Sequence, residues 1–214
     1  MRDGRVAGVV LAAGSSSRLG SNKLLIDLGG ETIVRRAARR ALEAGLAPAI
    51  VVLGFEADRV AEALRGLDVM PVVNLDHAGG MHGSLQAGIG RVPADCEAAV
   101  VILADMPLVT SAMSADLVAR FRAGSEPLVI SIYGAVQAPP TLYSRALFPA
   151  LGAAGEGCGR QVVRDHRDEA AAMKWPPALL ADLDRPEDVV RARGRLARDG
   201  SAESAGVDNP SIGR

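Results

Sequence analysis

Short runs of continuous apolar residues alternate along the chain with stretches of helical periodicity. The first run, Val-Ala-Gly-Val-Val-Leu-Ala at residues 6–12, stops at a glycine followed by three serines. Such a run, rich in β-branched residues and bounded by turn formers, is typical of a strand buried on both faces. Similar runs predict further strands at residues 49–53, 69–73, 98–104 and 128–132.

Helical patterns fill the intervals, at residues 31–45, 57–65, 83–89 and 111–121. The first of them carries one apolar stripe and has Gly45 at its end; the stripe consists of Ile33, Val34, Ala37, Ala38, Ala41 and Leu42. Strands that alternate with helices at this spacing predict βαβ units. We therefore expect an α/β fold, a three-layer α/β/α domain with a mostly parallel, Rossmann-like sheet over residues 1–197.

The alternation weakens in the second half of the chain, where proline interrupts a strand-like segment. Residues 135–143 contain Pro139 and Pro140. Proline has no N–H and cannot serve a central strand of a ladder. The segment therefore predicts a loop that leads into an edge strand.

The end of the chain predicts further helices and a tail. Short helical patterns cover residues 144–151 and 160–166. A last helix begins at Pro186, with Asp184 as its N-cap, and runs to about residue 196. Residues 198–214 are polar and without periodicity, so we expect a disordered C-terminal tail there.

Composition then limits the classes of function. The chain has 214 residues, 49% of them hydrophobic, and a net charge of −1, so it can build a core and lacks a general attraction to nucleic acid or membranes. Its two cysteines, Cys96 and Cys158, are too few for a disulfide framework and show no zinc spacing. No apolar run reaches the roughly 18 residues needed to span a bilayer, and the N-terminus lacks a secretory segment. We expect a cytoplasmic globular enzyme or binding domain, with no membrane association.

Arginines at positions 35, 36, 39 and 40 form a basic cluster on the first predicted helix. They lie opposite its apolar stripe, which is the usual place for solvated charges. We expect a solvated polar face and no nucleic-acid partner.

Candidate chemistry begins directly after the first predicted strand, in Leu11-Ala-Ala-Gly-Ser-Ser-Ser-Arg-Leu-Gly-Ser-Asn-Lys. A strand that ends in small residues and a Gly/Ser loop exposes backbone N–H groups that can cradle phosphates. Arg18 offers a planar fork for phosphate oxygens, and Lys23 offers a mobile point charge. Neither a Walker A motif nor G-x-G-x-x-G is present, and taken alone the loop also suits an ordinary strand-to-helix turn.

The same residues resemble the signature Leu-Ala-Ala-Gly-x-Ser-x-Arg-Leu-Gly-x-x-Lys of nucleotidyltransferases with a GT-A-like fold. Within that superfamily they are most similar to the molybdenum cofactor cytidylyltransferases. Related guanylyltransferases usually show Leu-Ala-Gly-Gly here, so Ala13 favours CTP. The resemblance implies that the loop backbone and Arg18 hold the triphosphate, while Lys23 stabilises charge at the phosphorus under attack. The loop backbone comprises Leu11, Ala12, Ala13 and Gly14.

Asp105 follows the predicted strand at residues 98–104, at the edge where open α/β sheets bind ligands. Its carboxylate suits Mg²⁺, although an aspartate before Met106-Pro107 equally suits a helix N-cap. The resemblance implies a metal role, because the family has an Asp-x-Pro motif whose aspartate binds the metal. A second block, Asp182-Leu-Asp-Arg-Pro-Glu-Asp, resembles a family motif in which the first aspartate completes the Mg²⁺ site and the second, here Asp184, caps the final helix.

A third block, residues 74–88, resembles the family pattern Asn-Pro-x-x-x-x-Gly-Met-x-x-Ser-Leu-x-x-Gly, with Leu75 in place of the proline. The resemblance implies that three of its residues line the nucleotide base, namely Gly80, Met81 and Ser84. A glycine hinge followed by a helix that starts with a serine is the plainer alternative. His77 and His82 have no third partner at zinc spacing, so we do not expect them to bind metal.

The resemblance finally implies a reaction: Mg²⁺-assisted attack by an acceptor phosphate on the α-phosphorus of CTP, with release of pyrophosphate. The implied acceptor is molybdopterin, with docking to a molybdoenzyme or its maturation chaperone. Departures at Glu156, Gly159 and Pro139, and an unassigned Cys158, leave the acceptor open. A guanylyltransferase or a sugar- or alcohol-phosphate nucleotidyltransferase on the same fold is the nearest alternative. An oxidoreductase or a non-catalytic binding protein that reuses the scaffold is the alternative from another class.

Overall fold

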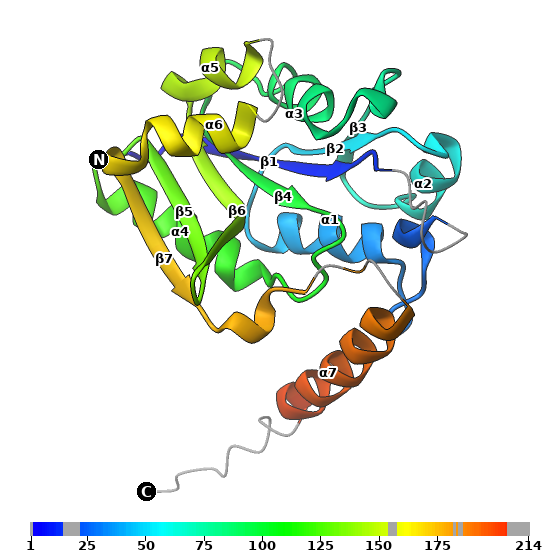
Figure 1. Cartoon of the computed structure of the whole chain (residues 1–214). Coiled ribbons are helices and arrows are strands. Elements are labelled where there is room, and N and C mark those ends of the chain that lie inside the picture. Colours follow the sequence, from blue (N-terminus) through cyan, green and yellow to red (C-terminus); the bar gives the residue numbers. More distant parts are fainter. Residues whose placement is uncertain (1, 15–21, 154–157, 182, 184–185, 205–214) are drawn as a thin grey trace, which may run out of the picture.

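The computed structural model describes residues 2–14, 22–153, 158–181, 183 and 186–204, without the side chains of residues 158, 186 and 197–204. In this part of the chain, seven strands form one sheet with the order β3-β2-β1-β4-β6-β5-β7 (Figure 1). The strands are β1 (Arg5–Ala12), β2 (Ala49–Leu53), β3 (Val69–Val73), β4 (Cys96–Leu103), β5 (Leu128–Tyr133), β6 (Val136–Ser144) and β7 (Ala170–Trp175). All neighbouring strands are parallel except where β6 meets β4 and β5. The expected mostly parallel sheet is confirmed.

Helices cover both faces of this sheet, as the three-layer prediction requires. One face packs on α1 (Ile33–Glu43), α2 (Ala57–Ala63), α4 (Ser111–Ala123) and α7 (Pro186–Ser204). The other face packs on α3 (Met81–Ile89), α5 (Phe148–Gly152) and α6 (Cys158–Asp165). Short 3-10 turns complete the order: η1 (Lys23–Leu25), η2 (His77–Gly79), η3 (Arg145–Leu147), η4 (Arg167–Glu169) and η5 (Pro177–Leu179). Successive residues of β1 alternate between the two cores, so Val10 faces the first and Val9 the second.

The predicted helices lie where the periodicity placed them, with ends shifted by a few residues. Thr32 caps α1, since its hydroxyl accepts a hydrogen bond from the Arg35 N–H, and Gly45 follows the helix with a φ of 75°. The last helix is longer than predicted: α7 continues past residue 196 to Ser204 and extends away from the sheet in Figure 1. Asp184 and residues 205–214 lie outside the described residues, so the predictions of an N-cap and of a tail there stay predictions.

The prediction of an edge strand near Pro139 and Pro140 is wrong. β6 lies between β4 and β5 and pairs with both in antiparallel register. The prolines fit because the ladder skips them: on β5, Ile130 pairs with Thr141 and Ser131 pairs with Ala138. Side chains serve the bulged carbonyls, since the Ser131 hydroxyl donates to Pro140 O at 2.7 Å and the Tyr133 hydroxyl donates to Pro139 O at 2.8 Å.

A strand without a sequence prediction, β7, closes the sheet next to β5. Its last residue, Trp175, packs against a small buried cluster of Met106, Val109, Met113 and Tyr133. Among the described residues, no helix is long and apolar enough to cross a lipid bilayer.

The expectation of a solvated arginine face on α1 is also wrong. All four arginines are half-buried, and each donates hydrogen bonds to a neighbouring segment. Arg35 reaches the carbonyl oxygens of residues 63 and 65, Arg36 reaches Leu28 O, Arg39 binds Glu31 and Glu43, and Arg40 reaches the carbonyl oxygens of residues 107 and 109. The long side chains cover apolar surface while their heads anchor loops, which periodicity alone does not distinguish from solvation.

Candidate functional site

A cavity of about 290 Å³ opens at the carboxyl ends of β1 and β4. It brings together nine residues that the sequence analysis proposed for the site: Leu11, Ala12, Ala13, Gly14, Lys23, Gly80, Met81, Ser84 and Asp105. Arg18 and Asp182 lie outside the described residues. A larger groove of about 740 Å³ lies between α7 and residues 178–181, and none of the proposed residues is among the described part of its lining.

Strand ends build one side of this cavity. Parallel register places Ala12 beside Leu53 and Leu11 beside Leu103, so the three strands stop at the same edge. The Ala104 N–H donates to Leu11 O at 3.1 Å, which ties the end of β4 to β1. Beyond Ala13, none of the residues that the structure describes places an atom within 4 Å of where a Cβ on Gly14 would lie.

Lys23 and Asp105 form an ion pair in the cavity. Lys23 Nζ lies 2.7 Å from Asp105 Oδ2, and the side chains are 13% and 26% exposed. The lysine comes from η1 and the aspartate from the turn after β4, 82 positions later in the sequence numbering. The structure thus places the predicted phosphate-binding cation in direct contact with the predicted metal-binding carboxylate.

The start of α3 forms the opposite side. Gly80 precedes the helix with a φ of 100°, a conformation that suits glycine, and no side chain caps the first turn. The Ser84 hydroxyl is buried and accepts a hydrogen bond from Asn74 Nδ2 at 3.1 Å, while Asn74 Oδ1 accepts one from the Asp76 N–H at 3.1 Å. Asn74 therefore holds the Ser84 hydroxyl oxygen as an acceptor. The proton of that hydroxyl remains available for donation.

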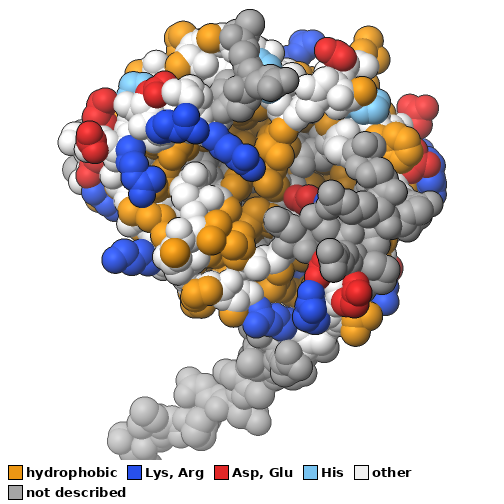
Figure 2. Space-filling view, in the orientation of Figure 1, with side chains coloured by type: hydrophobic (Ala, Val, Ile, Leu, Met, Phe, Trp, Pro, Cys, Tyr) orange, Lys and Arg blue, Asp and Glu red, His pale blue; other side chains and the backbone are white. Residues whose placement is uncertain are grey.

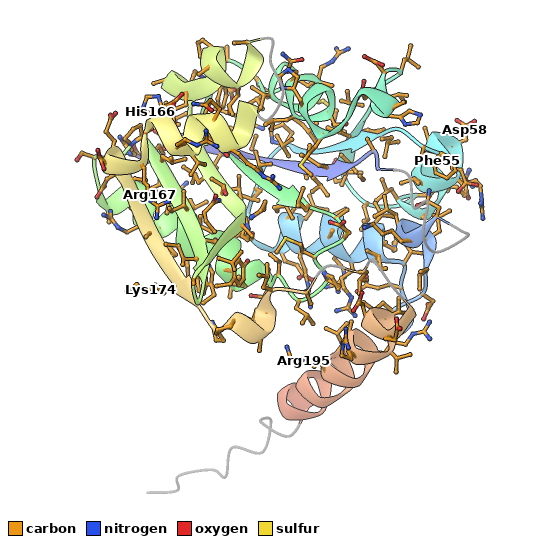
Figure 3. The ribbon with its side chains drawn as sticks, viewed as in Figure 1. Phe55, Asp58, His166, Arg167, Lys174 and Arg195 are labelled. Atoms are coloured by element: carbon orange, nitrogen blue, oxygen red, sulfur yellow. The ribbon has the colours of Figure 1, made fainter. Side chains whose placement is uncertain are left out.

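Four further residues line the cavity that the sequence analysis did not assign to it: Leu24, His77, Ala78 and Leu103. The His77 ring meets the Phe55 ring edge-on, with 6.5 Å between centroids; Figure 3 labels Phe55 near α2. A Cβ at Gly54 would come within 2.6 Å of both Ala13 O and His77 Cβ, so glycine allows η2 to close against β1. The sequence patterns assigned no role to Gly54, but a glycine directly after a buried strand is the signal by which this contact could be found.

A second cavity of about 270 Å³ adjoins the first, and Leu11, Met81 and Leu103 line both. Its wall is mostly apolar, with polar groups from Gln137, Thr141, Tyr143 and Arg160. Arg160 carries the only positive charge among the described residues of this lining. Figure 2 shows a band of hydrophobic side chains crossing this face, with basic groups on one side of it.

The proposed acceptor-side residues divide between described and undescribed positions. Pro139 and Gly159 line the second cavity, and the Tyr143 hydroxyl donates to Gly159 O at 3.4 Å. Glu156 and the side chain of Cys158 lie outside the described part. Within that part, no group of three His, Cys, Asp or Glu side chains could hold a metal by itself.

Residues 8–170 match the model of the MobA-like NTP transferase domain. The chain belongs to this family. The match covers the strand ends, η1, the start of α3 and the turn of Asp105, so the cavity is built from the family domain itself. The described cavity therefore lies within a domain of an NTP transferase family.

Individual relatives agree with the family in different ways. The molybdenum cofactor guanylyltransferase of Rhodobacter capsulatus is 27% identical over 195 residues, which cover 90% of this chain and 97% of that protein. The bifunctional protein GlmU of Kineococcus radiotolerans is 35% identical over 153 residues, which cover 70% of this chain but 31% of that protein. The MobA-like chain therefore spans about a third of the length of these GlmU relatives.

A solved structure extends the likeness to three dimensions. The crystal structure of Rv0371c from Mycobacterium tuberculosis H37Rv superposes with a TM-score of 0.79 at 26% identity, covering 89% of this chain and 98% of that one.

Proposed function

We propose that this MobA-like enzyme transfers CMP from CTP to a phosphate-bearing acceptor, molybdopterin by preference, and releases pyrophosphate. The observation that carries the proposal is the cavity of nine predicted residues with Lys23 and Asp105 in contact inside it. The guanylyltransferase relative, which matches along almost its whole length, supports a molybdenum cofactor as the acceptor. Delivery to a molybdoenzyme or its maturation chaperone belongs to the same proposal.

The donor chemistry at Asp105 fits Mg²⁺. A carboxylate supplies the hard oxygen that this ion prefers, and nucleotide phosphates and water supply the rest of its ligands. When bound, the ion would neutralise charge on the triphosphate oxygens. Asp182, outside the described residues, stays the proposed second protein ligand.

This chain's own residues would orient and neutralise the substrates. The backbone at residues 11–14 would hold the triphosphate, with Arg18 as a proposed further contact, and Lys23 would turn from Asp105 toward the phosphate under attack. An acceptor phosphate oxygen forms a new bond to the α-phosphorus, the bond from that phosphorus to the β-phosphate oxygen breaks, and pyrophosphate leaves. No general base is required, because a phosphate monoester is already ionised near neutral pH.

The two cavities divide the substrates between them in this proposal. The first, with Ala13, Gly80, Met81 and Ser84, would hold the nucleotide; the adjoining cavity would hold the acceptor, with Arg160 as its described cation. Their shared wall would bring the acceptor phosphate next to the α-phosphorus, which is the proximity that this transfer requires.

The base is the point on which a second candidate competes. The Rhodobacter capsulatus relative is named a guanylyltransferase, which favours GTP, whereas Ala13 favours CTP. Pyrophosphate release should be measured with CTP, GTP, UTP and ATP against molybdenum cofactor and against a sugar 1-phosphate. We expect the highest kcat/KM for CTP with molybdenum cofactor. Preference for GTP would reassign the base, and preference for the sugar phosphate would reassign the acceptor.

Replacing Asp105 tests the metal role. We expect Asp105→Asn to lower kcat by about two to three orders of magnitude, the usual effect of removing a group that stabilises transition-state charge. Asp58→Asn is the matched control, because Asp58 is exposed on α2, away from the cavity (Figure 3). Turnover by Asp105→Asn at the wild-type rate would remove Asp105 from the mechanism.

A further inference from the structure

Arg40 connects α1 to the turn that carries Asp105. Its Nη1 donates to Pro107 O at 2.6 Å and to Val109 O at 2.5 Å, across 67 and 69 positions of sequence. Arg40 is not among the described residues that line either cavity.

The turn depends on this contact. Residues 106–109 are buried, so their carbonyl groups are shielded from water. The Met106 and Val109 N–H groups donate to Leu103 O and Met106 O, at 3.3 and 3.2 Å, which curls the chain after β4. A buried carbonyl that loses its partner is unfavourable, so without Arg40 the turn would rearrange to reach another donor.

The guanidinium keeps its charge in this setting. Burial, together with the positive charges of Arg36 and Arg39, lowers the pKa of Arg40 to about 10, still far above neutral pH. The arginine therefore offers its donors at every pH at which the enzyme would work, and a charged donor binds carbonyl oxygens more strongly than a neutral one.

We propose that Arg40 is a positioning residue that fixes the Asp105 carboxylate at the geometry required for the metal–nucleotide complex. The inference rests on the proposed metal role of Asp105. Arg40 acts two residues after Asp105, where it holds the carbonyl oxygen of Pro107. The turn at Pro107 then orients Asp105, whose carboxylate would bind the cation.

Arg35 provides a matched control on the same helix. Its Nη1 also donates to two carbonyl oxygens, those of Ala63 at 3.1 Å and Arg65 at 2.9 Å. Ala63 is the last residue of α2 and Arg65 follows the helix, and neither lines a cavity. Loss of Arg35 thus removes the same kind of loop anchor without touching the turn of Asp105.

The experiment compares Arg40→Met, Arg40→Lys and Arg35→Met. Two quantities decide it: the Mg²⁺ concentration that half-saturates pyrophosphate release, and the affinity for Mn²⁺ with CTP in the absence of acceptor, followed by electron paramagnetic resonance. We expect Arg40→Met to weaken Mn²⁺ binding about 10–100-fold, the range for residues that orient metal ligands. Arg40→Lys should recover part of the loss, because it restores one charged donor. Arg35→Met should leave both quantities at the wild-type value.

Urea unfolding of each variant separates positioning from folding. If Arg40→Met loses stability but binds Mn²⁺ like the wild type, or if Arg35→Met weakens Mn²⁺ binding equally, the inference is overturned. If Arg40→Met does not fold, Arg40→Lys carries the same comparison. Asp105→Asn separates the metal role of Asp105 from the positioning role of Arg40. If Asp105→Asn binds Mn²⁺ with CTP as the wild type does, both roles are refuted. If Asp105→Asn binds Mn²⁺ weakly while Arg40→Met binds it normally, the metal role of Asp105 stands and only the positioning role of Arg40 is refuted.

Discussion

Lys23 and Asp105 neutralise each other in the free protein, at a distance that leaves no room for an ion between them. A cation that binds this oxygen of Asp105 displaces Lys23 Nζ from it. A triphosphate offers the lysine an anion in exchange, so the pair favours entry of metal and nucleotide together over entry of the metal alone.

The pair leads to a prediction for metal binding without nucleotide. Lys23→Met should tighten Mn²⁺ binding to the nucleotide-free protein by about tenfold, the order expected when one partly screened ion contact is lost. Turnover should fall at the same time, because the phosphate loses its cation. Lys174→Met is the control, since Lys174 is exposed on β7 (Figure 3). Equal Mn²⁺ affinity in Lys23→Met and the wild type would show that the pair does not restrain the carboxylate.

At the level of single residues, sequence motifs predicted those cavity residues that lie in short motifs at the ends of strands. Leu11 to Gly14 and Asp105 follow apolar runs directly, and parallel register then brings them together. Leu24 was not assigned because an apolar residue of this type carries no signal for a site, and His77 was considered only as a metal ligand. Arg40 was misread for a different reason: its acceptors lie 67 and 69 positions away, and no local pattern contains them.

At the scale of elements, α3 sits closer to the sheet than an ordinary helix would allow. A Cβ at Gly88 would come within 2.5 Å of Val9 Cγ1 and 2.9 Å of Val52 Cγ2. The opposite end of the same nine-residue helix carries Met81 and Ser84 into the cavity. The contact at Gly88 therefore holds the helix that forms one wall of the first cavity close to the sheet.

Gly88→Ala should lower the free energy of unfolding by about 1–3 kcal/mol, the usual cost of overpacking a core. It should also weaken CTP binding, since α3 must move outward to admit the methyl group. Gly152→Ala offers the comparison, because no described residue places an atom within 4 Å of the Cβ position there. Urea unfolding and calorimetric titration with CTP measure the two effects. Unchanged stability in Gly88→Ala would mean that the valines repack freely.

The strand β6 shows why an element can be predicted with the wrong place in the sheet. A proline residue cannot take part in the hydrogen-bond ladder of a central strand. A central strand can still contain proline where it bulges and the ladder skips that residue. Ser131 and Tyr133, on the neighbouring strand, supply the donors that the bulge needs. Their role depends on which strand is the neighbour, and strand order is a property of the whole chain.

For the whole molecule, the layers followed from the alternation of patterns, but the order of strands did not. β1 lies in the interior of the sheet between β2 and β4, which places its carboxyl end where loops from both sides converge. Local periodicity is blind to such neighbours, and it assigned no strand at all to β7.

Glu31 links the fold to pH. Burial opposes ionisation of this carboxyl, but hydrogen bonding with Arg39 and the charges of Arg39, Arg36 and Arg40 outweigh it, so its pKa lies below the ordinary value of 4.5. A group with a lowered pKa stabilises the fold above that ordinary value, and the stabilisation is lost as pH falls through the folded pKa.

Glu31→Gln should therefore be less stable than the wild type by about 1–2 kcal/mol near pH 7, the scale of hydrogen bonds to charged groups. The difference should shrink as pH falls below 4.5. Glu62→Gln is the control, because its pair with Arg65 is exposed, at 59% for the carboxylate side. Urea unfolding at a series of pH values measures both. A constant difference across this range would contradict the lowered pKa.

Trp175 is the only tryptophan of the chain, and its indole packs against the cluster that contains Met106, the neighbour of Asp105. Tryptophan emission responds to small changes around the ring, so the protein carries an intrinsic fluorescent reporter beside its proposed reaction centre. Excitation of that one indole would follow movement of the Asp105 turn in real time, in the native chain and without a label. The packing of a single edge-strand side chain thus makes the order of metal, nucleotide and acceptor binding accessible to stopped-flow mixing.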